Sequence, residues 1–142
     1  MAYNASIAAA TAMAPQLGTL SSTTTPTSTQ ATLVWDAAYD RVRLALASSG
    51  LATTFTSASI AEGWAERVEM LLTSGSLLLA KGSIGAGAES TAQTLLAAGE
   101  AALASLPEQR EALLAQGATG AAGAEWMGAS GTTRPLPDLG RA

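Results

Sequence analysis

The chain contains far more alanine than large apolar side chains, with 33 alanines against 26 residues of leucine, isoleucine, valine and phenylalanine combined. Alanine is the strongest helix former, but its methyl group removes little apolar surface from water. We therefore expect helices around a thin core, which leaves an isolated subunit marginally stable. Burial against neighbouring subunits is expected to supply the missing stability. An alanine-rich helical monomer is the alternative.

Two absences narrow the chemistry that the chain can perform. Histidine and cysteine do not occur in its 142 residues, so the commonest general base, the thiolate nucleophile and the strongest zinc ligands are missing. Seven basic residues stand against 11 acidic ones, a net charge of -4, so no basic surface is predicted that would neutralise a phosphate backbone. We expect a non-enzymatic protein with no catalytic site, no metal, no cofactor and no sequence-specific nucleic-acid binding.

Apolar residues at spacings of three and four predict three main helices near 29–49, 58–81 and 89–116, after a short one near 5–14. Pro107 lacks an amide hydrogen, so the third helix either kinks there or restarts with the proline in its first turn. The predicted fold class is all-α, a small helical bundle with no sheet of consequence. Seven side chains on the first two main helices are predicted to form its core: Trp35, Tyr39, Val42, Leu46, Trp64, Val68 and Leu71.

Two segments are too rich in Gly, Ala, Ser, Thr and Pro to build a core of their own. Residues 18–29 are expected to form an exposed polar loop within a helical domain at 1–116, and residues 117–142 an extended C-terminal docking tail. Large apolar groups in such a tail are costly to expose, and they are typical of docking arms. The predicted partner contacts in the tail are Trp126, Met127, Arg134, Leu136 and Leu139.

The best carboxylate cluster consists of Glu62, Glu66 and Glu69, which are neighbours on one predicted helix. Metal sites in helical bundles usually add a Glu-x-x-His motif, and this chain has no histidine. We therefore predict that these glutamates lie on a solvated helix face. No membrane span or secretory signal is predicted either, because the apolar runs are short and the first basic residue is Arg41.

Several motifs follow one another in the first 81 residues. They are the start Met1-Ala2-Tyr3, a short helix, the polar arm 21–30, the stretch Trp35-Asp36-Ala37-Ala38-Tyr39-Asp40-Arg41-Val42 and the helix end 46–51. In order and spacing they resemble the head-tail connector proteins, or adaptors, of tailed bacteriophages.

The resemblance implies a structural virion protein, a helical subunit repeated in a ring, a dodecamer, under the portal. Its implied partners are the portal protein, neighbouring copies of itself and a stopper or tail protein, and no membrane. Its implied location is the virion neck, after assembly in the host cytoplasm. DNA would pass through the ring without specific binding, which suits an acidic chain. The alternative is a small alanine-rich helical protein that is secreted or displayed on a surface, for which a Trp-x-Gly turn between two long helices would be expected and is lacking.

Overall fold

The computed structural model describes residues 3, 6–81 and 85–120, and within 85–120 it describes side chains from residue 89 onward. The described chain is mostly helical, which confirms the all-α prediction. Its elements, in chain order, are α1 (Ile7–Ala12), the 3-10 turn η1 (Pro15–Leu17), α2 (Ser28–Ser48), β1 (Leu51–Phe55), α3 (Ile60–Lys81), α4 (Gly85–Ala104), α5 (Leu106–Ala115) and β2 (Ala118–Gly120).

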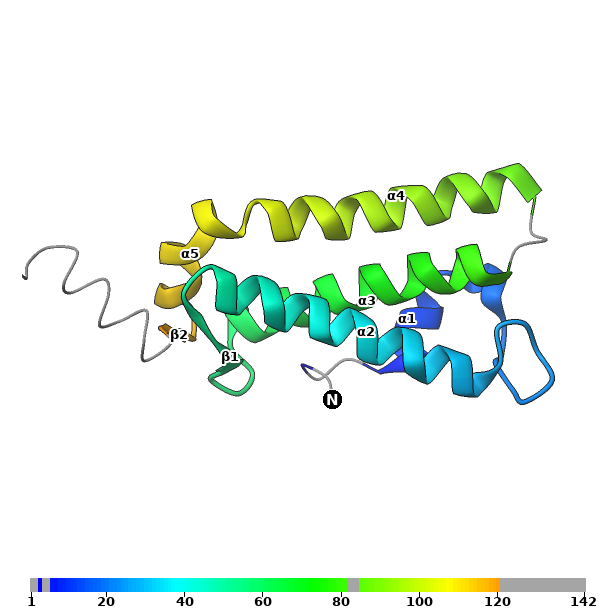
Figure 1. Cartoon of the computed structure of the whole chain (residues 1–142), viewed down its shortest axis with the longest axis horizontal. Coiled ribbons are helices and arrows are strands. Elements are labelled where there is room, and N and C mark those ends of the chain that lie inside the picture. The colour runs from blue at the N-terminus through cyan, green and yellow to red at the C-terminus, as the bar shows by residue number, and fades with distance from the viewer. Residues whose placement is uncertain (1–2, 4–5, 82–84, 121–142) are drawn as a thin grey trace, which may run out of the picture.

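Helix α3 is the centre of the bundle (Figure 1). Helices α2 and α4 both pack along it, and α1 and η1 pack against it as well. Helix α5 and the two strands lie together at one end of the long helices. None of the described helices is long and apolar enough to cross a membrane.

Helix α2 begins at a capping box, because Thr27 and Gln30 satisfy each other's free backbone amides. The Gln30 N–H donates to Thr27 Oγ1 at 3.2 Å, and the Thr27 N–H donates to Gln30 Oε1 at 2.9 Å. The chain leaves the other end of α2 through Gly50, whose φ of +78° is favoured by glycine. Both ends of α2 are therefore fixed by local sequence.

The predicted helix 89–116 is two helices. Helix α4 already begins at Gly85, and α5 begins at Leu106 with Pro107 in its first turn. A proline is tolerated there because the first amides of a helix have no partner within the helix. The chain therefore restarts a helix at Pro107, one of the two outcomes that the sequence left open.

A two-stranded antiparallel sheet joins β1 to β2, with Leu51 opposite Gly120 and Phe55 opposite Ala118. The sequence predicted no sheet of consequence, and it placed the residues of β2 within the tail. Gly117 makes the turn into β2 with a φ of +115°, and a Cβ there would collide with Ser59. Because Ala118 is buried against the main core, the helical unit extends to Gly120 rather than ending at residue 116.

The core residues proposed from sequence differ in how deeply they are buried. Val42, Leu46 and Val68 are fully buried, whereas Tyr39 and Trp64 are partly buried against the same cluster. Trp35 and Leu71 are half-buried. The fully buried leucine of that turn of α3 is Leu72, the next residue along the chain.

Candidate functional site

The most unusual group in the described structure is the carboxyl of Glu69 on α3, which is fully buried. The prediction that Glu69 lies on a solvated face is therefore wrong. Its helix position places it among residues of α3 that are also buried, Val68 and Leu72, because α3 is covered by α2, α4 and the N-terminal segment. Glu62 and Glu66 are only half-buried, so the three glutamates do not share one environment.

Tyr3 lies against the buried carboxyl of Glu69. Its backbone N–H donates to Glu69 Oε1 at 3.1 Å, and its hydroxyl donates to the backbone oxygen of Thr53 on β1 at 2.8 Å. Its ring lies 5.0 Å from the ring centroid of Tyr39 and 5.2 Å from that of Phe55, within the range of favourable aromatic pairs. One residue near the start of the chain thus connects α2, α3 and β1.

Two buried polar atoms beside this contact have no hydrogen-bond partner among the described residues, the indole nitrogen of Trp35 and Oε2 of Glu69. When the carboxyl is ionised, Oε2 is an acceptor and the indole N–H is a donor, so the two are then complementary. The indole of Trp35 lies near enough to oppose the rise in the pKa of Glu69, although the two atoms do not reach hydrogen-bond geometry. An unpaired group in a protein interior costs stability, which makes this a high-energy part of the core.

Burial raises the pKa of Glu69 from its ordinary 4.5 to about 7, because a carboxylate loses its hydration there. The amide of Tyr3 acts in the opposite direction, and the charge of Asp36 adds to the rise. Burial also raises the pKa of the Tyr3 hydroxyl, so that group stays protonated at any physiological pH. Of these two groups, Glu69 is the one whose shifted pKa lies near neutral pH.

Five residues form one buried cluster that joins the N-terminal segment to α2, α3 and β1: Tyr3, Trp35, Tyr39, Phe55 and Glu69. Its two described hydrogen bonds join Tyr3 to α3 and to β1. Within residues 3, 6–81 and 85–120, no group of three or more acidic side chains is placed to hold a metal ion. The chemical role that this arrangement supports is attachment of the N-terminal segment to the bundle.

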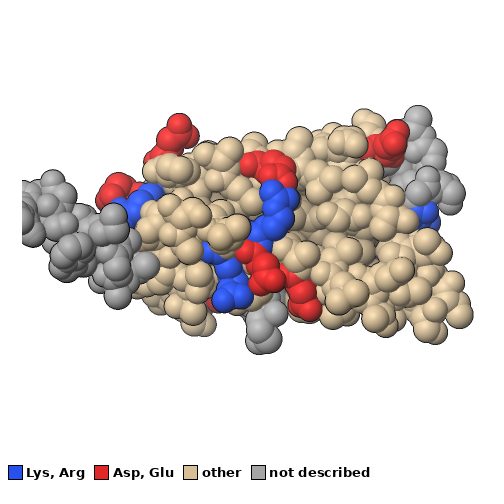
Figure 2. Space-filling view, viewed as in Figure 1, with Lys and Arg blue, Asp and Glu red and all other residues tan. Residues whose placement is uncertain are grey.

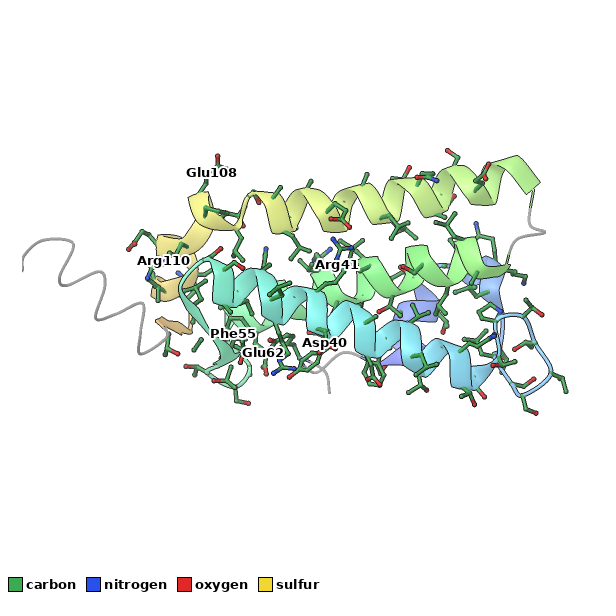
Figure 3. All side chains as sticks on the ribbon, viewed as in Figure 1. Asp40, Arg41, Phe55, Glu62, Glu108 and Arg110 are labelled. Carbon is green, nitrogen blue, oxygen red and sulfur yellow. The ribbon has the colours of Figure 1, made fainter. Side chains whose placement is uncertain are left out.

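A groove of about 370 Å³ runs between α2 and α4 on the surface. Arg41 on α2 reaches across to Glu100 on α4, where Nη2 of Arg41 donates to Oε1 of Glu100 at 2.6 Å. Figure 3 labels Arg41 in the space between α2 and α4. This pairing raises the pKa of Arg41 and lowers that of Glu100. The remaining lining residues continue to the end of α2 and α4: Leu44, Ala45, Ser48, Leu103 and Ala104.

Charge is unevenly distributed over the face that carries this groove. Figure 2 shows basic and acidic side chains in a band across the middle of the face and broad uncharged areas on both sides of it. The ion pairs Arg41–Glu100 and Arg43–Asp40 both involve the middle of α2. Arg43 also lies over the ring of Tyr39, 5.2 Å from its centroid, and so connects this band to the buried aromatic cluster.

A second cavity, of about 390 Å³, lies between α1, the polar loop and the start of α2. No charged side chain lines it, and the hydroxyls of Thr11 and Thr32 donate to backbone oxygens of their own helices. It therefore offers hydroxyl groups but no charged group to orient a ligand.

The five predicted docking residues of the tail, Trp126, Met127, Arg134, Leu136 and Leu139, lie outside the described residues. Comparison with protein families, with curated proteins and with solved structures finds no match to this chain.

Proposed function

We propose that this chain is a structural virion protein, a head-tail connector or adaptor subunit. Copies of it form a ring under the portal, join the capsid to the tail and surround part of the DNA channel. The proposal rests first on the order of motifs in residues 1–81, which resembles that family.

The observation that carries the proposal is that two motifs of this resemblance, the start of the chain and the central motif of α2, meet in space. The start of the chain supplies Tyr3, and the central motif of α2 supplies Trp35 and Tyr39. The ring of Tyr3 contacts the ring of Tyr39, and Tyr3 and Trp35 both approach Glu69. Motifs that depend on one another in the fold are more informative together than alone, which supports treating them as one signature.

The described surface also supports a role in assembly. Leu33, Ile60 and Leu79 are large apolar residues that are 65%, 69% and 41% exposed, respectively. Contacts with further subunits would remove them from water, and about 25 cal/mol is gained for each Å² of apolar surface so buried. Because the core is rich in alanine and poor in large side chains, burial of these residues between subunits would add to the stability of the chain.

The low charge of the chain suits a DNA channel. A net charge of -4 provides no continuous cationic track, so a duplex that moves through the ring would not be held by its phosphates. Ion pairs such as Arg41–Glu100 neutralise part of the basic charge that is present.

The test is co-expression of the full chain with the portal protein that the same genome encodes. We expect the two to co-purify as one large particle, with a ring of the chain visible by electron microscopy. Removal of residues 121–142 should leave the helices folded by circular dichroism and abolish co-purification, and Trp126→Ala should weaken it. A matched control is Thr94→Ala, which changes an exposed residue of α4 and should co-purify normally.

If the full chain and the portal protein remain separate at high concentration, the proposed function is wrong. Normal particles from the shortened chain would instead show that the tail has no docking role.

A further inference from the structure

Helix α2 carries a second pattern of residues on the side that faces away from the core. Its fully buried residues face the bundle: Ala31, Ala38, Val42 and Leu46. Six exposed residues follow one another on the opposite side at alternating spacings of three and four, and together they form what we call the outer ridge: Gln30, Leu33, Ala37, Asp40, Leu44 and Ala47. Leu33 and Leu44 are 65% and 69% exposed, and they point the same way because they lie about three helical turns apart. Alternating spacings of three and four are those of the contact positions in a two-helix coiled coil.

Charged residues flank the middle of the outer ridge. Asp36 and Arg43 lie about two turns apart, so they follow each other along one flank of the ridge. Arg41 lies on the other flank, next to α4, where it pairs with Glu100. The two exposed leucines stand one on each side of these charges along the helix. Figure 2 shows the same order on the surface, with charged side chains across the middle of the face and uncharged areas on both sides.

The outer ridge is complementary to a copy of itself that runs in the opposite direction. A two-fold axis across the middle of the ridge places Leu33 opposite Leu44 of the second copy, and Leu44 opposite its Leu33. The same axis places each Asp40 opposite the small Ala37. Two ridges that run in the same direction would instead place the two Asp40 carboxylates against each other, and like charges repel. The antiparallel arrangement is therefore the favourable one.

We propose that the outer ridge of α2 binds the outer ridge of a second copy of this chain in an antiparallel dimer. Leu33 and Leu44 pack on each other at both ends of the contact. Asp36 of each copy comes beside Arg43 of the other, on the same flank of the ridge, so the contact also pairs opposite charges. This dimer goes beyond the proposed function, because neighbours in a ring share one orientation and the two copies here run in opposite directions. It is a state of the free chain, and it covers the ridge until other subunits bind.

Sedimentation equilibrium of the purified full chain, from about 10 μM to about 1 mM, measures the dimer. Stable complexes bury about 1,600 Å² in total, and one helix of each copy covers less, so we expect a weak dimer that separates on dilution. Leu33→Glu and Leu44→Glu should each raise the dissociation constant at least about tenfold, because each places a carboxylate against a leucine of the other copy. Leu44→Ala should also weaken the dimer, and it keeps the helix propensity of α2. Ile60→Glu is the matched control, because Ile60 is 69% exposed on α3 and lies outside the outer ridge, and it should leave the dissociation constant unchanged.

Cross-linking tests the direction of the two copies, and the chain has no cysteine of its own to interfere. One chain carries Gln30→Cys and a second, distinguished by a size tag, carries Ala47→Cys. The antiparallel contact places these two exposed positions opposite each other. We expect the disulfide in the mixture to form at least about tenfold faster than in either variant alone. The control mixture pairs Ala47→Cys with Gln109→Cys, which changes an exposed glutamine of α5, and it should cross-link no faster than Ala47→Cys alone.

A chain that stays monomeric up to about 1 mM would overturn the proposal, and so would an equal weakening by the changes at Leu44 and Ile60. Faster disulfide formation in Ala47→Cys alone than in the mixture would mean that the copies run in parallel, which would also overturn it. Assemblies that survive Leu44→Glu would show that another surface joins the copies, with the same consequence. The experiment uses the chain without the portal protein, so the dimer and the proposed connector function can each fail without the other.

Discussion

The backbone N–H of Tyr3 donates to Oε1 of Glu69, 66 residues further along the chain, and this bond is buried. The carboxyl that accepts it has a second oxygen with no partner among the described residues. The start of the chain is thus held by a group that the protein interior penalises when it is charged. The stability of the contact between Tyr3 and Glu69 therefore depends on whether Glu69 is protonated.

The first prediction is a fall in stability as the pH rises from about 5 to about 7. The pKa of Glu69 is 4.5 in its ordinary state and about 7 in the fold, so in this range the folded chain keeps a proton that the unfolded chain has lost. The free energy of unfolding should decrease by about 2 kcal/mol over the window and become flat above about pH 8. Urea unfolding at a series of pH values measures this slope.

Glu69→Gln should remove most of this pH dependence, because the amide does not ionise. The control is Glu100→Gln. The pairing with Arg41 lowers the pKa of Glu100. The stability that the Glu100 carboxylate contributes is therefore present above pH 4.5 and is lost only as the pH falls below that value. Its removal should leave the slope between pH 5 and pH 7 unchanged. A wild-type chain that gains stability across this range would contradict the proposed state of Glu69.

The second prediction concerns the two attachments of Tyr3. Tyr3→Phe removes the hydroxyl that donates to Thr53 but keeps the ring against Tyr39 and Phe55, so it should lower the free energy of unfolding by about 1 kcal/mol. Tyr3→Ala also removes the buried ring and should cost about 3–5 kcal/mol. Thr54→Ala changes an exposed residue of β1 and should have little effect. Thermal unfolding of the three variants compares them, and equal losses for the two Tyr3 variants would mean that the ring does not contribute.

The helices were predictable because their signals are local. The spacing of apolar residues marks α2 and α3, Thr27 and Gln30 mark the start of α2, and Pro107 marks the restart at α5. The sheet was not predictable in the same way. Its strands pair residues far apart in the chain, and β2 consists of Ala118, Thr119 and Gly120, which carry no apolar alternation.

The buried cluster was only partly predictable. Trp35 and Tyr39 were expected to face the interior from their positions on α2. The sequence shows Glu69 as one of several glutamates on α3, and periodicity favours a wet face for such residues. Its burial depends on the N-terminal segment, which covers that part of α3 through Tyr3. A contact of this kind between distant segments leaves no periodic signal in either of them.

The third prediction separates two adjacent leucines of α3. Leu72 is fully buried and Leu71 only half-buried, so Leu72→Ala should cost about 2–5 kcal/mol and Leu71→Ala clearly less. Trp64→Ala should also be costly, because the indole packs on the main core. Glu66→Ala, on the same helix, should change little. Chemical denaturation gives the ranking, and a larger loss at Leu71 than at Leu72 would mean that α3 is rotated from the position described.

The last prediction concerns the close crossing of α3 and α4, where two glycines each accept a leucine of the opposite helix. A Cβ on Gly75 would lie 2.7 Å from Leu96 Cγ and 3.1 Å from the backbone oxygen of Ala92, and a Cβ on Gly99 would lie 2.7 Å from Leu72 Cδ2. The backbone oxygen cannot move without shifting α4, and Leu72 is fully buried.

Alanine at Gly75 or Gly99 should therefore cost about 1–3 kcal/mol, although alanine is the better helix former at both. Gly63 is the control within α3, because a Cβ there meets no atom of the described chain within 4 Å. Gly63→Ala should stabilise the protein by about 0.5–1 kcal/mol. Thermal unfolding of the three single variants tests whether alanine lowers stability at Gly75 and Gly99 and raises it at Gly63. If all three variants are stabilised, helix propensity outweighs packing at this crossing and α3 and α4 are further apart than described.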